Sequence, residues 1–115
     1  MQYSINIRLF DDYLNVEKGL SVNTRSAYLK DIYFFEAFLS SKKPAIELHN
    51  VQSQDITKYV INIVNKGFTK STQSRILSSL RQFYNFLFNE KYIKENPMTG
   101  ITNPQIKKKA RKHLK

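Results

Sequence analysis

Apolar residues recur at helical spacing in four segments of the chain, and no segment reads convincingly as a strand. In the last of these segments, between Gly67 and Phe88, the apolar positions form one stripe: Ile76, Leu77, Leu80, Phe83, Tyr84 and Leu87. The opposite face over residues 70–82 carries only hydroxyl, amide and cationic side chains. We therefore predict an amphipathic helix whose outer face is suited to an anionic surface.

Start and stop signals bound the first two segments. The first helix is predicted over residues 4–18, with Gly19 as its stop. The second is capped by Ser21 and must end before Pro44. The residues expected to face inward in these two helices are Leu9, Phe10, Tyr13, Leu14, Tyr28, Leu29, Ile32, Phe35 and Leu39.

The other two segments have equally clear ends. The third helix is predicted to start at Ser53 or Gln54 and to stop at Gly67, and the fourth to be capped by Thr69 and to end near Glu90. The third helix should bury Ile56, Tyr59, Val60, Ile63 and Val64. The pattern as a whole predicts an all-α four-helix bundle.

The sequence after the fourth helix is expected to be extended. Asn-Pro pairs at 96–97 and 103–104 punctuate it, and six cations fall in the last nine residues. We assign residues 1–104 to one helical domain and residues 105–115 to a basic linker or tail. The loop over residues 42–52 has the weakest pattern, and no role is assigned to it.

Charge is unevenly distributed along the 115 residues. Residues 1–55 hold six Lys/Arg and seven Asp/Glu, a net charge of −1, whereas residues 56–115 hold thirteen and two, a net charge of +11. The tail alone could be a solvated charged run. Without its six cations the chain still carries +4 out of the stated +10. A polyanionic partner is favoured, with nucleic acid ahead of a membrane.

Composition excludes several classes of protein and of binding site. There are no cysteines, which excludes disulfides and thiolate metal sites and fits a reducing cytoplasm. No apolar run approaches the roughly 20 residues that span a bilayer, and the N-terminus does not read as a signal peptide. Two isolated histidines and three dispersed glycines predict neither a metal site nor a phosphate-binding loop. We expect a cytoplasmic protein without metal or cofactor.

Two of the predicted helices begin alike, as GLSVNTR (residues 19–25) and GFTKSTQSR (residues 67–75). Each has a glycine stop, an apolar residue, a hydroxyl cap, and then a threonine and a basic residue. Ordinary capping explains the hydroxyls, because Ser and Thr are preferred caps. Helix N-termini also bind phosphates, and nearby hydroxyls and cations reinforce that binding. Together with the acid-free face, the caps predict these DNA contacts: Asn23, Thr24, Arg25, Lys70, Thr72, Arg75, Ser78 and Arg81.

Four stretches resemble the core-binding domain of tyrosine recombinases and phage integrases. They are FxxYLxxEKGLSxNTxxxYxxDIxxF (residues 10–35), DIxxYV (55–60), TxxRxLSSLRxFYxFL (72–87) and NP (96–97). The resemblance extends from about Ile5 to Pro104 and is closest to Xer-like or mobile-element integrases. It implies a SAM-like four-helix domain that covers one face of duplex DNA while a second domain closes the clamp.

In that family the second domain holds the catalytic Arg, Lys, His-x-x-Arg and His/Trp set and the tyrosine nucleophile. No such set can be placed in this chain, since Gln52 stands where Arg should follow His49, and His113 lies close to the end. Four of the seven tyrosines fall on inward stripes. We expect a non-enzymatic part of a recombinase with no catalytic residue, whose partners are DNA and other recombinase protomers.

Two alternatives stay open. The chain could be a free-standing DNA-binding accessory protein that uses the fourth helix for recognition. It could also be a helical protein-interaction module whose basic face docks an acidic partner. Continuation of the reading frame into a domain with the catalytic motifs would favour the recombinase, and a mobility shift with duplex DNA would separate the other two.

Overall fold

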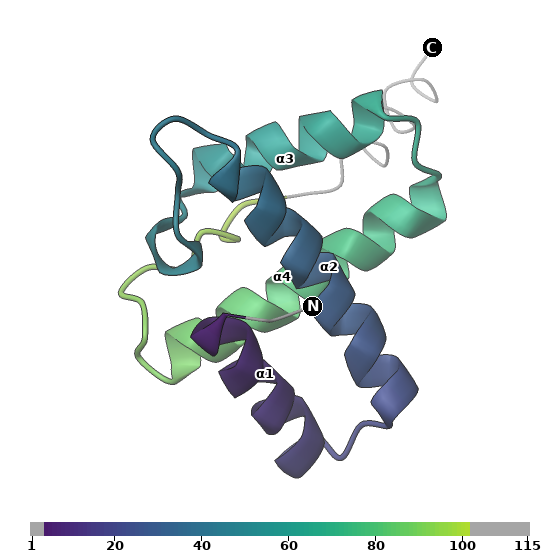
Figure 1. The fold of residues 1–115 in the computed structure, drawn as a ribbon, viewed down its shortest axis with the longest axis vertical. Coiled ribbons are helices and arrows are strands. Elements are labelled where there is room, and N and C mark those ends of the chain that lie inside the picture. The colour runs from purple at the N-terminus through teal and green to yellow at the C-terminus, as the bar shows by residue number, and fades with distance from the viewer. Residues whose placement is uncertain (1–3, 102–115) are drawn as a thin grey trace.

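Helices make up all the regular structure in the computed structural model, which describes residues 4–101 (Figure 1). Over that range the elements are α1 (Ile5–Val16), α2 (Val22–Ser40), the short 3-10 helix η1 (Leu48–Asn50), α3 (Ser53–Asn65) and α4 (Lys70–Asn89). The predicted all-α, four-helix architecture is confirmed, with helix ends close to those predicted. The predicted tail, residues 105–115, lies outside the described residues.

The helices form two antiparallel pairs that cross. Figure 1 shows α1 beside α2, α3 joined to α4 by a short turn, and α2 lying across α4. Both turns reverse the chain at a glycine with positive φ, +62° at Gly19 and +83° at Gly67. Side chains with a Cβ rarely adopt this backbone conformation, so the predicted glycine stops have a steric basis.

The apolar stripe of α4 forms the centre of the core. All six of its predicted residues are at most 5% exposed, and Phe83 meets Phe10 of α1 edge-on at 5.3 Å between ring centroids. Tyr84 of α4 lies edge-on to Phe35 of α2 at 6.4 Å between ring centroids, and Phe35 in turn packs on Tyr59 of α3 at 4.8 Å. Thus α4 contacts helices from both pairs, and its burial unites the bundle.

The predicted inner face of α1 needs one correction. Its buried residues are Ile7, Phe10 and Leu14, whereas Leu9 and Tyr13 are only partly buried. Residues three and four apart lie on one helical face, so the stripe is centred on Ile7 and the two predicted residues flank it. Tyr28 and Val64, which were also predicted to face inward, are likewise only partly buried.

The loop after α2 contributes to the core, although the sequence assigned it no role. Leu48 is 3% exposed, and its carbonyl accepts a 2.9 Å hydrogen bond from the buried Tyr84 Oη. The phenol therefore has a partner deep in the bundle, as buried polar groups require.

Polar contacts tie the segment after α4 back onto the helices. Ser53 Oγ at the start of α3 donates to the Pro97 carbonyl at 2.8 Å, and Asn96 Nδ2 donates to Asn85 Oδ1 of α4 at 2.8 Å. Met98 is buried, with 4% of its surface exposed. The prediction of an extended segment is therefore wrong for residues 90–101, which form turns and bends that lie against both α3 and α4.

Candidate nucleic-acid interface

The N-termini of α2 and α4 have the same cap. Ser21 Oγ accepts from the Thr24 backbone N–H at 3.2 Å, and Thr69 Oγ1 accepts from the Thr72 backbone N–H at 3.2 Å. In each case the cap hydroxyl also donates to the threonine hydroxyl, at 3.1 and 3.0 Å. The remaining first-turn N–H groups lie at the positive end of the helix dipole, where anions bind favourably.

A groove between α2 and α4 brings together four of the eight predicted contact residues. Asn23 and Thr24 come from α2, and Arg75 and Ser78 come from α4. The groove encloses about 440 Å³. Because α2 crosses α4 here, residues about 50 positions apart in the sequence line one surface.

A buried carboxylate fixes Arg75 within this groove. Arg75 Nη2 lies 2.9 Å from Asp31 Oδ1, and Ser79 Oγ donates to Asp31 Oδ2 at 2.7 Å. Asp31 is 4% exposed, whereas the Arg75 side chain is 56% exposed. The guanidinium is thus held at one nitrogen while its other donors remain near solvent.

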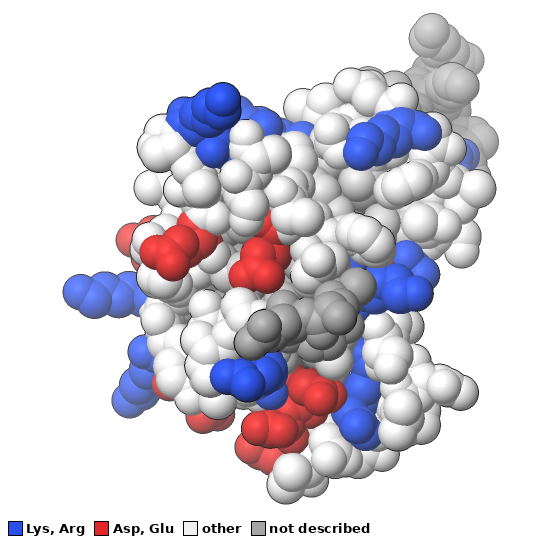
Figure 2. Space-filling model, in the orientation of Figure 1, with Lys and Arg blue, Asp and Glu red and all other residues white. Residues whose placement is uncertain are grey.

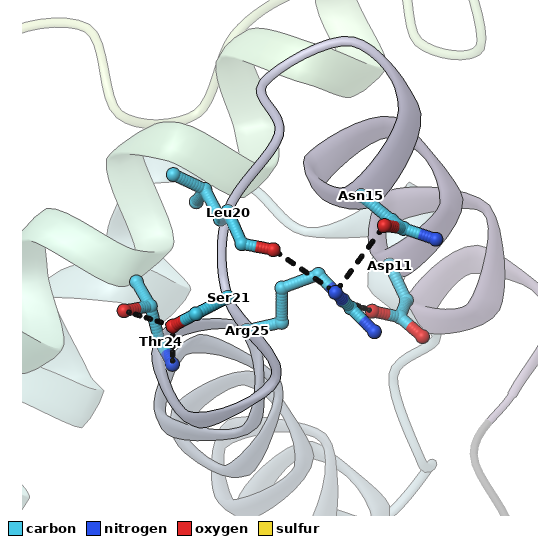
Figure 3. A network of polar contacts seen from close by, with 6 residues as sticks. All are labelled: Asp11, Asn15, Leu20, Ser21, Thr24 and Arg25. Atoms are coloured by element: carbon cyan, nitrogen blue, oxygen red, sulfur yellow. Dashed lines mark hydrogen bonds and ion pairs between the residues drawn. The ribbon is translucent and has the colours of Figure 1, made fainter.

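Arg25 lies instead in a network that joins α2 to α1 (Figure 3). Its Nε donates to Asp11 Oδ1 at 2.8 Å, and its Nη1 donates to Asn15 Oδ1 at 3.3 Å and to the Leu20 carbonyl at 3.0 Å. Only 18% of the side chain is exposed. The prediction that Arg25 meets a phosphate stays a prediction, and the structure adds an intramolecular role that the sequence did not indicate.

The other three predicted residues lie outside the groove. Lys70 is exposed as the first residue of α4, and Thr72 lines a neighbouring hollow that Arg75 also lines. Arg81 is exposed farther along α4, where its Nη2 donates to the Ile101 carbonyl at 3.3 Å. Together these positions extend the polar face of α4 beyond both ends of the groove.

Lys and Arg are spread over most of the face seen in Figure 2, and Asp and Glu lie among them on the left, in the centre and in the lower part of the view. The right-hand margin, beside the α3–α4 turn and the crossing of α2 over α4, shows Lys and Arg without Asp or Glu. Residues 56–89, which include α4 and most of α3, contain no acid. A surface of this kind favours an anionic partner.

The sequence did not indicate a set of residues around the neighbouring hollow. Lys30, Phe34, Lys66 and Phe68 line it, and Asp31 lies between it and the α2–α4 groove. The one available signal was an acid at position 31 beside Ile32 on the inward stripe of α2, because a charge at such a position requires a partner. The hollow itself depends on how three helices pack and has no local sequence signal.

Two buried tyrosines are held in their protonated form. Burial, with the Asp31 carboxylate as a smaller cause, raises the pKa of Tyr59 to about 12. Burial above all raises the pKa of Tyr84 well above its ordinary value. Their rings pack in the core, as predicted for residues on inward stripes.

Among residues 4–101 no group of three or more metal-ligating side chains could hold an ion, and no helix is long and apolar enough to cross a membrane.

Comparison with known proteins gives consistent matches. A sequence profile described as the phage integrase N-terminal SAM-like domain matches residues 7–91. The chain is 39% identical over 100 residues to the tyrosine recombinase XerD of Shewanella oneidensis, covering 87% of the chain and 33% of XerD. It is 41% identical over 95 residues to XerC of Listeria monocytogenes serotype 4a, covering 82% of the chain and 31% of XerC. The chain therefore spans about a third of the length of these relatives.

Proposed function

The chain belongs to the family of phage integrase N-terminal SAM-like domains, and we propose that it is the core-binding domain by which an Xer-like tyrosine recombinase clamps duplex DNA. The observation that carries this proposal is the α2–α4 groove, where Asn23, Thr24, Arg75 and Ser78 meet between two matching helix caps. These residue types supply phosphate donors and base-edge donors on one surface.

The two caps would hold the DNA backbone. At the α4 cap, the exposed Lys70 and the first-turn N–H groups favour one phosphate. At the α2 cap, Thr24 and Asn23 favour another. Arg25 keeps this second cap in place by tying it to α1, and its own phosphate contact is the least direct of the set.

Between the caps, the polar face of α4 would enter the major groove. An α-helix with its side chains is about 10–12 Å wide, and the major groove is about 12 Å wide. Arg75 and Ser78 lie where α2 crosses α4, so they would be nearest the base edges. Thr72 and Arg81 would lie toward the two flanking backbones.

Strand cleavage would belong to the part of the recombinase that this chain does not span. The family's catalytic set cannot be placed on these 115 residues, and Tyr59 and Tyr84 are buried with raised pKa values. We expect the chain to bind DNA without cutting or joining it. In the complete recombinase, residues 105–115 would begin the link to the catalytic domain, and further protomers would complete the assembly on cytoplasmic DNA.

Competition between two polyanions tests the proposal. Fluorescence anisotropy of a labelled duplex should show binding that unlabelled duplex displaces far better than polyglutamate of matched charge. An Asn23→Ala, Ser78→Ala double variant removes two neutral polar contacts and should weaken duplex binding. Asn89→Ala, at the end of α4, is the matched control and should leave it unchanged.

Equal displacement by both polyanions would contradict the proposal and favour a protein-interaction module. Covalent adducts on a nicked suicide duplex would contradict the assignment of cleavage to another part of the recombinase.

A further inference from the structure

A second hollow lies beside the α2–α4 groove, where α2, α3 and α4 meet. It encloses about 720 Å³ and shares Arg75 and Asp31 with the groove. A ligand in the groove would therefore lie next to this hollow. Its lining differs from that of the groove because it combines aromatic rings with several lysines.

Two aromatic side chains stand open to solvent on the lining of the hollow. Phe34 of α2 is 53% exposed, and Phe68 of the α3–α4 turn is 42% exposed. The turn that carries Phe68 is fixed, since the buried Gln73 donates from Nε2 to the Phe68 carbonyl at 2.7 Å. Single exposed apolar residues need no explanation, but two that line one hollow offer exposed ring surface to a flat apolar group bound there.

Cations line the same hollow as these rings. Lys30, Lys42 and Lys66 line the hollow, and Lys42 Nζ lies 4.2 Å from the centre of the Phe38 ring. Neither Lys30 nor Lys66 has an ion-pair partner within residues 4–101. Among the described lining residues the one acid is Asp31, which Arg75 and Ser79 already hold. The hollow therefore favours a ligand that joins negative charge to a flat apolar face.

A nucleotide with an unpaired base has both properties. Its base can stack on aromatic rings, and its phosphates can pair with lysines, as in proteins that bind single strands. A paired base offers neither face, because its neighbours in the duplex cover both. An acidic, aromatic peptide has related chemistry, but continuity with the proposed DNA groove through Arg75 favours the nucleotide.

We propose that the hollow between α2, α3 and α4 binds an unpaired nucleotide next to the duplex, with its base on Phe34 and Phe68 and its phosphates near Lys30 and Lys66. This inference rests on the proposed function for its DNA partner. It adds a preference for locally opened DNA that the α2–α4 groove alone does not provide.

Three labelled DNAs test it at one fixed salt concentration: a continuous duplex, the same duplex with a short mismatched bubble, and a single strand containing 2-aminopurine. The chain should bind the bubble about fivefold or more tightly than the duplex, as expected for one stacked base. It should also quench 2-aminopurine fluorescence. Phe34→Ala with Phe68→Ala should abolish the preference and the quenching while leaving duplex affinity unchanged.

Phe88→Ala is the matched control, because Phe88 is 43% exposed but does not line the hollow. It should keep the bubble preference. Equal affinity for bubble and duplex would overturn the inference, and so would a bubble preference that survives the loss of both rings. Neither result would contradict the proposed function, which concerns duplex binding. Binding of an acidic aromatic peptide that requires Phe34 and Phe68, without any bubble preference, would assign the hollow to a protein partner and also overturn it. Failure to bind duplex, with single-strand quenching retained, would instead contradict the proposed function alone.

Discussion

Asp31 of α2 and Arg75 of α4 form an ion pair across the crossing of the two helices, with 2.9 Å between Oδ1 and Nη2. The carboxylate is buried and also accepts from Ser79 Oγ at 2.7 Å, whereas the guanidinium extends to the surface. One pair therefore connects the packing of α2 on α4 to the orientation of the cation nearest the proposed DNA groove.

Replacing Asp31 should affect both stability and DNA binding. Asp31→Ala leaves Arg75 and Ser79 without their shared acceptor, and because Arg75 is half exposed we expect a loss of about 1–3 kcal/mol in the free energy of unfolding. Duplex affinity should also fall, since Arg75 is no longer held in place. Urea unfolding and anisotropy measure the two effects. The control Asp12→Ala, at an exposed position of α1, should change neither. An unchanged free energy of unfolding for Asp31→Ala would show that the pair does not hold α2 on α4.

Arg25 should prove to be chiefly a structural residue. Arg25→Ala removes three hydrogen bonds between α2, α1 and their turn, so we expect the free energy of unfolding to fall by about 1–2 kcal/mol. Arg25→Lys should restore little of it, because an ammonium group cannot reproduce the forked geometry. Urea unfolding measures both variants, and the exposed Arg8→Ala is the control. Full stability in Arg25→Ala, with a reduced salt dependence of DNA binding, would instead identify Arg25 as a phosphate contact.

The salt dependence of DNA binding should separate phosphate contacts from base contacts. Lys70→Ala should reduce the slope of log affinity against log salt by about one, because one fewer phosphate is neutralised. Arg75→Ala should cost roughly 1–3 kcal/mol of binding free energy and should relax sequence preference if it reads a base edge. Anisotropy across a salt series measures both, with Lys94→Ala as a control beyond α4. Unchanged binding in a folded Arg25→Ala, Lys70→Ala, Arg75→Ala variant would place the DNA site elsewhere.

The fold should lose stability at high pH through its buried tyrosines. The folded-state pKa of Tyr59, about 12, lies above the ordinary 10.0. The protonated phenol therefore contributes fully to the free energy of unfolding below pH 10, and this contribution is lost as pH rises from 10 to 12. Each such group changes the free energy of unfolding by up to about 1.4 kcal/mol per pH unit in that window. Urea unfolding across the window should show this decline, and Tyr59→Phe should make it shallower. An identical pH dependence in the variant would contradict the raised pKa of Tyr59.

Local sequence signals were sufficient to predict the helices but not the contacts of their charged residues. The Gly19 and Gly67 stops and the Ser21 and Thr69 caps act within a few neighbouring residues, so the helix ends could be predicted from the sequence. Arg25 follows a hydroxyl cap and a threonine, and that local pattern predicted a phosphate contact for it. Its partners within the chain, Asp11 and Asn15, lie on another helix and become adjacent only when α1 packs on α2.

In the candidate site, too, some features follow from local sequence and others depend on how the helices pack. The polar face of α4 follows from helical periodicity, which placed Arg75 and Ser78 outward and Leu80 inward. That Asn23 and Thr24 join them depends on the crossing of α2 over α4, and the similarity of the two caps was the only sign of it in the sequence. The hollow lined by Phe34 and Phe68 depends on three helices at once and could not be predicted.

The contacts of the segment after α4 have a mechanical consequence. Ser53 of α3 and Asn85 of α4 each hold this segment, and Arg81 reaches the Ile101 carbonyl. A pull applied at Ile101 is therefore resisted first by these hydrogen bonds and by the buried Met98, before any helix is stretched. Because the segment is held by α3 as well as by α4, a torque applied there acts on two helices at once and not on the last helix alone.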